Sequence, residues 1–217
     1  MTQNPDRAAA LRLVPVSRET EDRLALYVDM LAKWRRITNL VSEATFTDVW
    51  RRHIADSAQL LDLAPQAKKW VDLGSGAGFP GMVLAIQLAE TTGAEVHLIE
   101  SDQRKCAFLR EVARATSASA RIHAARIETI APETLTPVDA VTARALAPLP
   151  ILLGYAKTWM MEGAIGIFPR GRTVEAQLRA TPDSPELRFE SVESKIDAQA
   201  AILVVRRAES AQHHSRS

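Results

Sequence analysis

The chain is poor in cysteine and has no long apolar run. Its 217 residues include a single cysteine, Cys106, so no internal disulfide can form and no second thiolate is available for a metal site. No segment approaches the roughly 20 apolar residues of a membrane span, and residues 1–7 lack the basic and then apolar order of a signal peptide. These absences predict a cytoplasmic protein that binds no metal, with Cys106 as a buried helix residue.

Charge of one sign is not in excess either. The chain has 27 Lys and Arg residues against 26 Asp and Glu, a net charge of +1, so composition alone does not call for a polyanionic partner. A hydrophobic share of 47% with 24% charged residues excludes a largely disordered chain. The length suits one α/β domain of roughly 150 residues with a small appended element, and excludes two full enzyme domains.

Two helical patterns occupy the first 65 residues. Ser17 is a suitable N-cap for an amphipathic helix over residues 18–33. A second helix is expected over residues 45–61, since Ala64-Pro65 would end it. Residues 1 to 15 show neither pattern and predict a loose terminus. We therefore expect residues 1–65 to form an N-terminal helical extension.

From residue 69 short β-prone runs alternate with helical patterns, which is typical of a parallel sheet covered by helices. The expected strands cover residues 69–73, 95–100, 121–124, 140–142 and 164–168, and the expected helices cover 80–90, 102–115 and 149–161. Strands at 187–192 and 200–206 then follow with little helix between them, which predicts an antiparallel hairpin at one sheet edge. The fold class is α/β, with five β-α units in a domain over residues 66–207 and a polar tail over 208–217.

A glycine-rich turn, Gly74-Ser75-Gly76-Ala77-Gly78, directly follows the first expected strand, with Asp72 two residues ahead of it. Glycines let a backbone turn sharply and approach a ligand closely. The dinucleotide fingerprint requires a third glycine where this chain has the bulky Phe79, and the Gly-Lys-Ser/Thr ending of a P-loop is missing. S-adenosylmethionine carries no phosphate and needs only backbone contacts to its amino acid part and a carboxylate for its ribose. The turn therefore predicts a site for that cofactor.

Glu100 ends the second expected strand, about 20 residues past the glycine turn. An acid at this place can accept hydrogen bonds from both hydroxyls of a ribose. Either Glu100 or Asp72 alone could be an ordinary strand-end acid, but both at these offsets favour a cofactor site. Asp102, by contrast, is expected to cap the following helix.

Three segments together resemble one known family. They are Asn39-Leu40, the run Arg52-His53-Ile54-Ala55-Asp56-Ser57, and residues 70–81. They are similar to the glucose-inhibited division protein B family, the bacterial small-subunit rRNA guanine-N7 methyltransferases, and the similarity extends from about residue 33 to 171. Two positions depart from the pattern: Arg35 stands where members often have Asn, and Arg170 where they often have Lys. Arginine is a different donor, so a role specific to lysine at position 170 is in doubt.

The resemblance implies a class I S-adenosylmethionine-dependent methyltransferase, which is Rossmann-like, with a mostly parallel seven-stranded sheet, an antiparallel edge hairpin and N-terminal helices. It implies methyl transfer to N7 of a guanine in the decoding-region hairpin of 16S rRNA. Because N7 of neutral guanine carries a lone pair and no proton, no general base is needed, and Arg144 is the candidate nearest the reaction. The expected cofactor-binding residues, from spacing and resemblance together, are Asp72, Gly74, Gly76, Gly78, Phe79, Glu100, Ile127, Glu128 and Arg144.

The expected partner is 16S rRNA or the small ribosomal subunit, bound by a monomer. The candidate RNA-binding residues are arginines near tryptophans or near the expected site: Arg35, Arg36, Arg51, Arg52, Arg170 and Arg172. For these arginines a solvated surface role is an equally good interpretation, and Trp34 and Trp50 are better read as core anchors than as stacking platforms. His53 is expected to form a hydrogen-bonded structural unit with Asp56. Arg144 could instead be a strand-end arginine paired with a surface acid.

Two other functions fit the same pattern. A methyltransferase of this fold acting on a small molecule or protein would bind its substrate independently of salt, whereas an RNA enzyme would lose substrate affinity steeply as salt rises. A noncatalytic RNA-binding or ribosome-assembly module would not bind S-adenosylmethionine. The intact glycine turn with Glu100 argues against the second alternative.

Overall fold

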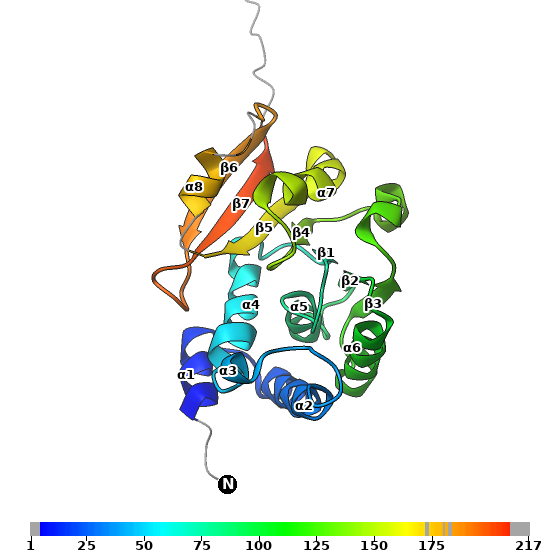
Figure 1. Ribbon diagram of the computed structural model, residues 1–217, viewed down its shortest axis with the longest axis vertical. Helices are drawn as coiled ribbons and strands as arrows, with labels where there is room; N and C mark the ends of the chain where they lie inside the picture. Colours follow the sequence, from blue (N-terminus) through cyan, green and yellow to red (C-terminus); the bar gives the residue numbers. More distant parts are fainter. Residues whose placement is uncertain (1–4, 172–173, 180, 182–183, 209–217) are drawn as a thin grey trace, which may run out of the picture.

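The computed structural model describes residues 5–171, 174–179, 181 and 184–208. A twisted sheet lies between two layers of helices, with α2, α5 and α6 on one side and α7 on the other (Figure 1). The α-helices are α1 (Pro5–Leu13), α2 (Arg18–Trp34), α3 (Glu43–Phe46), α4 (Asp56–Ala58), α5 (Gly81–Gln87), α6 (Gln103–Thr116), α7 (Leu149–Met161) and α8 (Val174–Arg179). Shorter turns are the π-helix η1 (Trp50–Ala55) and the 3₁₀ turns η2 (Gln59–Leu63), η3 (Ile127–Thr129) and η4 (Pro132–Leu135). None of the described helices is long and apolar enough to cross a bilayer.

The sheet has the strand order β3-β2-β1-β4-β5-β7-β6. Its strands are β1 (Lys69–Leu73), β2 (Glu95–Glu100), β3 (Ala120–Ala124), β4 (Ala140–Thr142), β5 (Ile165–Arg170), β6 (Leu187–Glu193) and β7 (Ala201–Arg207). The first five strands pair in parallel, and β7 pairs antiparallel with both β5 and β6. The sequence-based predictions of a mostly parallel sheet and of an antiparallel edge hairpin are thus confirmed. Because strand order reverses between β1 and β4, the carboxyl ends of these strands border a crevice where ligands bind in open α/β sheets.

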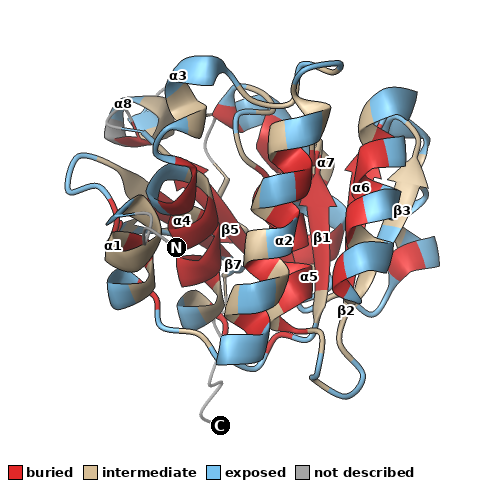
Figure 2. Ribbon diagram, turned by 90° about the horizontal axis from the view of Figure 1, so that it is seen from below, coloured by how far each residue is buried: buried red, intermediate tan, exposed pale blue. Residues whose placement is uncertain are grey.

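The core is divided between the two faces of the sheet. Side chains alternate along β1, so Trp70 points toward α5 and α6 while Val71 and Leu73 point toward α7. On the first face α2 adds Leu24 and Tyr27, both fully buried. Figure 2 shows buried residues along β1 and α5 and exposed residues on the outer surface of α6. The N-terminal helices therefore complete the hydrophobic core of the sheet.

Helix caps predicted from the local sequence are confirmed in α2 and α6. Ser17 caps α2, its hydroxyl accepting a hydrogen bond from the backbone N–H of Thr20 at 3.2 Å. Asp102 likewise caps α6, accepting from the N–H groups of Arg104 and Lys105. Cys106 is a buried helix residue, as expected.

The loose terminus expected for residues 1–15 is wrong for its described part, where α1 forms. The single helix expected over residues 45–61 is also wrong, because α3 ends at Phe46 and η1 begins at Trp50. A contact between these two segments explains the break. The Asp6 carboxylate of α1 accepts hydrogen bonds from the backbone N–H groups of Trp50 (2.9 Å) and Arg51 (3.3 Å), which are thereby satisfied outside a regular α-helix.

The expectation of five β-α units fails after β3. The described chain there forms only the 3₁₀ turns η3 and η4 before it enters β4. Pro132 and Pro137 lie in this connection, and proline breaks an α-helix because it lacks the donor N–H and its ring clashes with the preceding turn.

Candidate active site

A cavity of about 450 Å³ lies at the carboxyl ends of β1, β2 and β4. Its wall is built from the loops that follow these strands and β3. The lining includes Gly74, Gly76, Glu100, Ile127, Glu128 and Arg144, all of them expected cofactor-binding residues. Sequence positions 74 to 144 are brought together because parallel strands deliver all their carboxyl ends to one edge of the sheet.

The glycine turn forms the floor of this cavity. Gly74, Gly76 and Gly78 all have positive φ angles, +66°, +58° and +101°, a backbone region that side chains disfavour. A Cβ atom on Gly74 would lie 2.5 Å from Leu146 of the loop after β4, whereas one on Gly76 would meet little. The turn is thus folded tightly against the β4 loop at Gly74 and open toward the cavity at Gly76.

Glu100 joins the glycine turn to the loop that precedes α6. Its carboxylate accepts hydrogen bonds from the backbone N–H groups of Gly76 and Asp102, both at 2.8 Å. Each carboxylate oxygen retains a further lone pair, and the side chain lines the cavity. Glu100 is therefore fixed in position and able to accept hydrogen bonds from a diol such as a ribose.

The far wall of the cavity carries residues that sequence reasoning missed. Tyr155 of α7 donates its hydroxyl to Glu128 Oε1 at 2.7 Å, and Lys105 of α6 also lines the cavity. The hydrogen bond from Tyr155 lowers the pKa of Glu128. Neither residue belongs to a motif, and only the packing of α6 and α7 places them here.

Three expected cofactor-binding residues do not line this cavity: Asp72, Gly78 and Phe79. Asp72 is fully buried, and its Oδ2 accepts a hydrogen bond from the N–H of Gly81 at 3.1 Å, at the start of α5. Burial raises the pKa of Asp72 to about 6. Asp72 therefore links the end of β1 to the start of α5, on either side of the glycine turn.

Phe79 lies in a stack of three side chains from separate segments. The His53 ring packs face to face on Phe79 with centroids 4.8 Å apart, and the Arg144 guanidinium lies 5.1 Å from the Phe79 centroid. Burial and the nearby arginines lower the pKa of His53 to about 3, so the imidazole is neutral at physiological pH. A smaller cavity of about 220 Å³ borders this stack and the glycine turn.

The expected unit of His53 with Asp56 is wrong. Both ring nitrogens of His53 are buried without a hydrogen-bond partner among the described residues. Asp56 instead pairs with Arg144 (Nη1 to Oδ2, 3.5 Å) and accepts from the Gln59 amide at 3.1 Å. On the helical turn that carries His53 and Asp56 the two side chains diverge, the former toward Phe79 and the latter toward Arg144.

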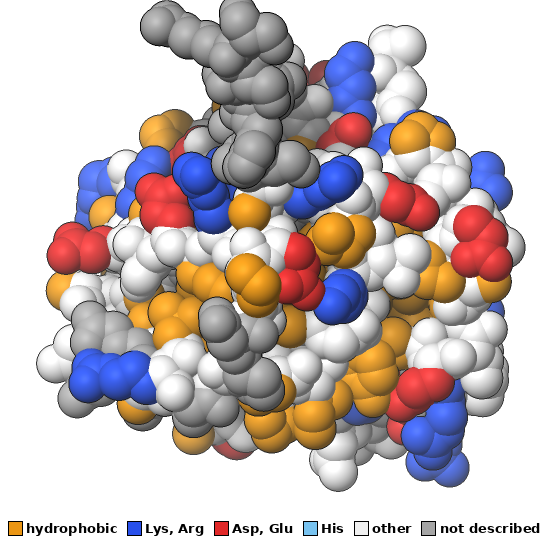
Figure 3. All heavy atoms as spheres, turned by 90° about the horizontal axis from the view of Figure 1, so that it is seen from above, with side chains coloured by type: hydrophobic (Ala, Val, Ile, Leu, Met, Phe, Trp, Pro, Cys, Tyr) orange, Lys and Arg blue, Asp and Glu red, His pale blue; other side chains and the backbone are white. Residues whose placement is uncertain are grey.

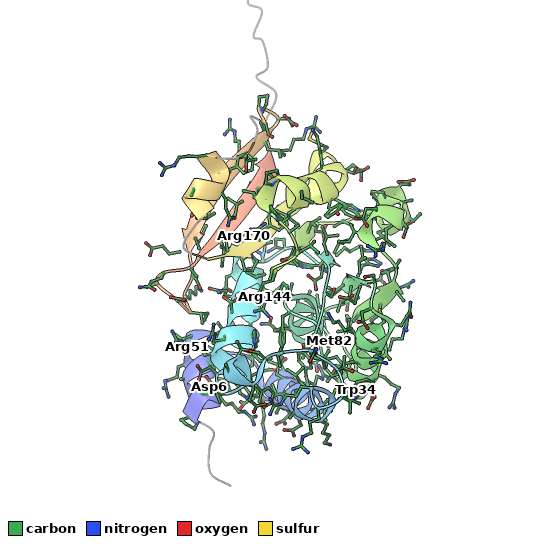
Figure 4. The ribbon with its side chains drawn as sticks, in the orientation of Figure 1. Asp6, Trp34, Arg51, Met82, Arg144 and Arg170 are labelled. Atoms are coloured by element: carbon green, nitrogen blue, oxygen red, sulfur yellow. The ribbon has the colours of Figure 1, made fainter. Side chains whose placement is uncertain are left out.

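Arg144 stands at the junction of these features. It donates to the backbone oxygen of Arg52 at 3.2 Å as well as pairing with Asp56. Figure 4 shows it near the middle of the molecule, between α4 and the sheet, with Arg170 further along β5. Arg144 is thus paired with an acid, but Asp56 is largely buried and is not the surface acid of the alternative interpretation, and the Arg144 side chain also lines the 450 Å³ cavity.

The other expected RNA-binding residues lie in different surroundings. Arg35 pairs with Glu43 and packs over Phe46, while Arg36, Arg51 and Arg52 are exposed. Arg172 lies outside the described residues. Trp50 is buried and Trp34 packs against Phe108 with centroids 5.6 Å apart, which confirms both as core anchors.

Comparison with known proteins agrees with this architecture. The model of the family described as rRNA small subunit methyltransferase G matches residues 20–204. A ribosomal RNA small subunit methyltransferase G from Bradyrhizobium diazoefficiens is 54% identical over 173 residues, covering 80% of this chain and 66% of that protein. One from Methylobacterium radiotolerans is 50% identical over 202 residues, covering 93% of this chain and 95% of that protein.

Solved structures show the fold at low sequence identity. Cofactor-bound Rv0187 from MTB aligns with a TM-score of 0.63 at 17% identity, over 96% of this chain and 100% of that one. A mutant of MtNAS in complex with S-adenosylmethionine aligns with a TM-score of 0.53 at 14% identity, over 96% of this chain and 86% of that one. Both alignments span the helical extension and the sheet. The chain belongs to the GidB family, described as rRNA small subunit methyltransferase G.

Proposed function

We propose that this protein transfers a methyl group from S-adenosylmethionine to N7 of a guanine in the decoding-region hairpin of 16S rRNA. The observation that carries the proposal is the cavity at the sheet edge, where the open face of Gly76 and the carboxylate of Glu100 lie opposite Arg144 in a chain of this family. We further propose that the enzyme acts in the cytoplasm as a monomer, without a metal ion.

The residues of the cavity fit the parts of S-adenosylmethionine. Glu100 would hold the ribose hydroxyls, and the backbone around Gly74 and Gly76 would hold the amino acid part. Ile127 offers apolar surface to the adenine, with Glu128 and Tyr155 at its edge. Asp72, Gly78 and Phe79 would act indirectly by shaping the turn, as their absence from the cavity lining and the hydrogen bond of Asp72 to Gly81 support.

Bound S-adenosylmethionine would supply an electrophilic methyl group: guanine N7 would attack the methyl carbon with its lone pair, in line with the C–S bond that breaks, and S-adenosylhomocysteine would leave. Since N7 has no proton to lose, the chain's residues serve to position the base and to set the local charge. Arg144 is held by Asp56 and by the backbone oxygen of Arg52. Its guanidinium is thereby fixed at the border of the cavity of about 450 Å³, which we call the cofactor cavity. We propose that it orients the reacting groups and takes no part in proton transfer.

Methyl transfer to ribosomal substrate tests the proposal directly. Small subunits and bare 16S rRNA from cells lacking this protein are incubated with labelled S-adenosylmethionine, and the labelled base is mapped. Label at one guanine N7 of the decoding-region hairpin is expected, and the better substrate shows at which stage of assembly the enzyme acts. Label absent from both substrates, with cofactor binding intact, would contradict the RNA substrate and favour a small molecule or protein.

A further inference from the structure

A second cavity, of about 300 Å³, lies on the other side of Arg144 from the cofactor cavity. We call it the Asp56 cavity; its lining includes Asp56, Arg144, Ala145, Arg170, Ser194 and Ala200. Arg144 and Ala145 line both cavities, so a molecule in the Asp56 cavity would be a direct neighbour of one in the cofactor cavity. Its size is at the lower end of the range for small-molecule sites, about 300 to 1,000 Å³.

The hydrogen-bond acceptor in this cavity is the Asp56 carboxylate, which a network of hydrogen bonds holds in place. The Asp56 carboxylate accepts from Gln59 Nε2 through Oδ1 and from Arg144 through Oδ2. Gln59 is itself held by the loop that follows β6, since its amide donates to Ser194 Oγ at 3.1 Å and its Oε1 accepts from the N–H of Lys195 at 2.9 Å. Each Asp56 oxygen keeps one unused lone pair, and the side chain is 21% exposed.

The donor in this cavity is Arg170. Its Nη1 donates to the backbone oxygen of Ala147 at 3.4 Å, while its Nε and Nη2 are buried with no partner among the described residues. These two N–H groups form one edge of the guanidinium, the arrangement that binds an oxygen acceptor most strongly. Buried donors without a partner carry a desolvation cost, which a ligand oxygen that met this edge would relieve.

A neighbouring groove adjoins the Asp56 cavity. It has a volume of about 410 Å³, and its lining includes Arg51, Arg52, Ala200 and three acids, Asp48, Asp56 and Asp197. Asp56 and Ala200 line both hollows, so the groove and the cavity lie against the same two residues. The exposed arginines of the groove can bind the phosphates of a strand whose base enters the cavity.

We propose that the Asp56 cavity is the pocket for the target base, with Asp56 accepting N1–H and the 2-amino N–H of guanine and Arg170 donating to O6. This inference rests on the proposed function. The Watson–Crick edge of guanine presents one acceptor and two donors, which complement the guanidinium edge and the carboxylate. Adenine presents a donor where guanine has O6 and an acceptor where it has N1–H, so both contacts would fail. N7 lies on the adjoining edge of guanine, beside O6, and would face the wall that Arg144 and Ala145 share between the two cavities.

The test replaces the target guanosine by inosine, which lacks only the 2-amino group, in small subunits reconstituted with the altered 16S rRNA. The wild-type enzyme is expected to methylate guanosine at least about tenfold more efficiently in kcat/KM, the value of one hydrogen bond to a charged group. The variant Asp56→Asn is expected to methylate both substrates at similar, reduced rates. The matched control is Asp62→Asn, an exposed acid paired with Lys195, which should keep the wild-type preference.

Asp56 also holds Arg144, so a loss of activity alone would not identify its role. The preference between guanosine and inosine is the readout that a purely structural role would not move. Competition binding of the two subunits in the presence of S-adenosylhomocysteine gives the same ratio without turnover, and Asp56→Glu should restore part of the preference. Equal methylation of both substrates by the wild type, or an unchanged preference in Asp56→Asn, would overturn the assignment. Failure of the wild type to methylate guanosine at all would refute the proposed function instead.

Discussion

At Gly78 of the glycine turn a Cβ would meet three side chains at once. A Cβ at this position would lie 2.8 Å from Met82 and from the Tyr27 hydroxyl, and its φ of +101° is itself unfavourable for other residues. Gly78→Ala is therefore expected to lower the free energy of unfolding by about 2 to 5 kcal/mol, measured by urea denaturation. Gly154→Ala in α7 is the control, because a Cβ there meets nothing and alanine favours a helix by roughly 0.5 to 1 kcal/mol.

Gly74 tests the cofactor assignment. An aspartate there would add bulk against Leu146 and a negative charge at the cavity wall, so Gly74→Asp should abolish measurable binding of S-adenosylmethionine in calorimetry. Gly93→Asp is the matched control, since Gly93 also has a positive φ (+78°) but lies in open space. Unchanged affinity in Gly74→Asp would show that the cofactor binds elsewhere.

His53 makes stability depend on pH. Its pKa is about 3 in the folded protein, against about 6.5 when unfolded, so below pH 6.5 the unfolded chain takes up a proton that the folded one does not. The stabilisation is complete above pH 6.5 and is lost as pH falls toward 3, amounting to up to about 2 kcal/mol between pH 6.5 and 5. His53→Phe should lose less stability than the wild type over this interval in urea unfolding at each pH. Equal losses would mean that His53 is protonated in the native state.

At the scale of elements, α2 supports the glycine turn from outside the sheet. The Tyr27 hydroxyl donates to the backbone oxygen of Ala77 at 2.6 Å, and burial raises the pKa of Tyr27 well above its usual value. Tyr27→Phe leaves that carbonyl unpaired, so the free energy of unfolding should fall by about 1 to 3 kcal/mol. Cofactor affinity should also fall by up to about tenfold, because the turn loses an anchor.

The control on the same helix is Arg23→Gln, which breaks an exposed ion pair with Glu90. Such pairs contribute about 0 to 1 kcal/mol, so stability should change little and cofactor affinity should not change. A Tyr27→Phe protein that binds the cofactor like the wild type would show that α2 contributes to packing alone.

The helices differ in how well sequence predicted them, for a physical reason. In α2 and α6 the caps Ser17 and Asp102 act on N–H groups two or three residues away, so a local pattern contains the whole signal. The segment after Phe46 departs from its pattern because Asp6, 44 residues earlier, takes the N–H of Trp50. No local periodicity can register a hydrogen bond acceptor from another helix.

At the scale of the whole molecule, a net charge of +1 means that binding to RNA must depend on local arginines. In Figure 3 the Lys and Arg side chains on the face in view lie at separate points and form no continuous patch. Substrate affinity should nevertheless fall steeply with salt, and Arg52→Gln should reduce the slope of log K against log salt by about 0.7, the value for one single-strand phosphate contact. Filter binding at several salt concentrations measures this, and cofactor affinity should stay nearly constant. A flat response would favour a small-molecule substrate.

The sequence by itself determined the positions of the strands, the mostly parallel sheet, the glycine turn and the acid at the end of β2. These features depend on the spacing of apolar side chains and on backbone freedom within a few residues. The tertiary structure alone decided which side chains meet. Arg144 and Asp56 are 88 residues apart, Tyr27 and Ala77 are 50 apart, and Gln59 and Ser194 are 135 apart. Such pairs form only when helices and strands pack at particular distances and rotations. His53 and Asp56 are three residues apart, and only the packing of their helix decides that His53 stacks on Phe79 while Asp56 pairs with Arg144.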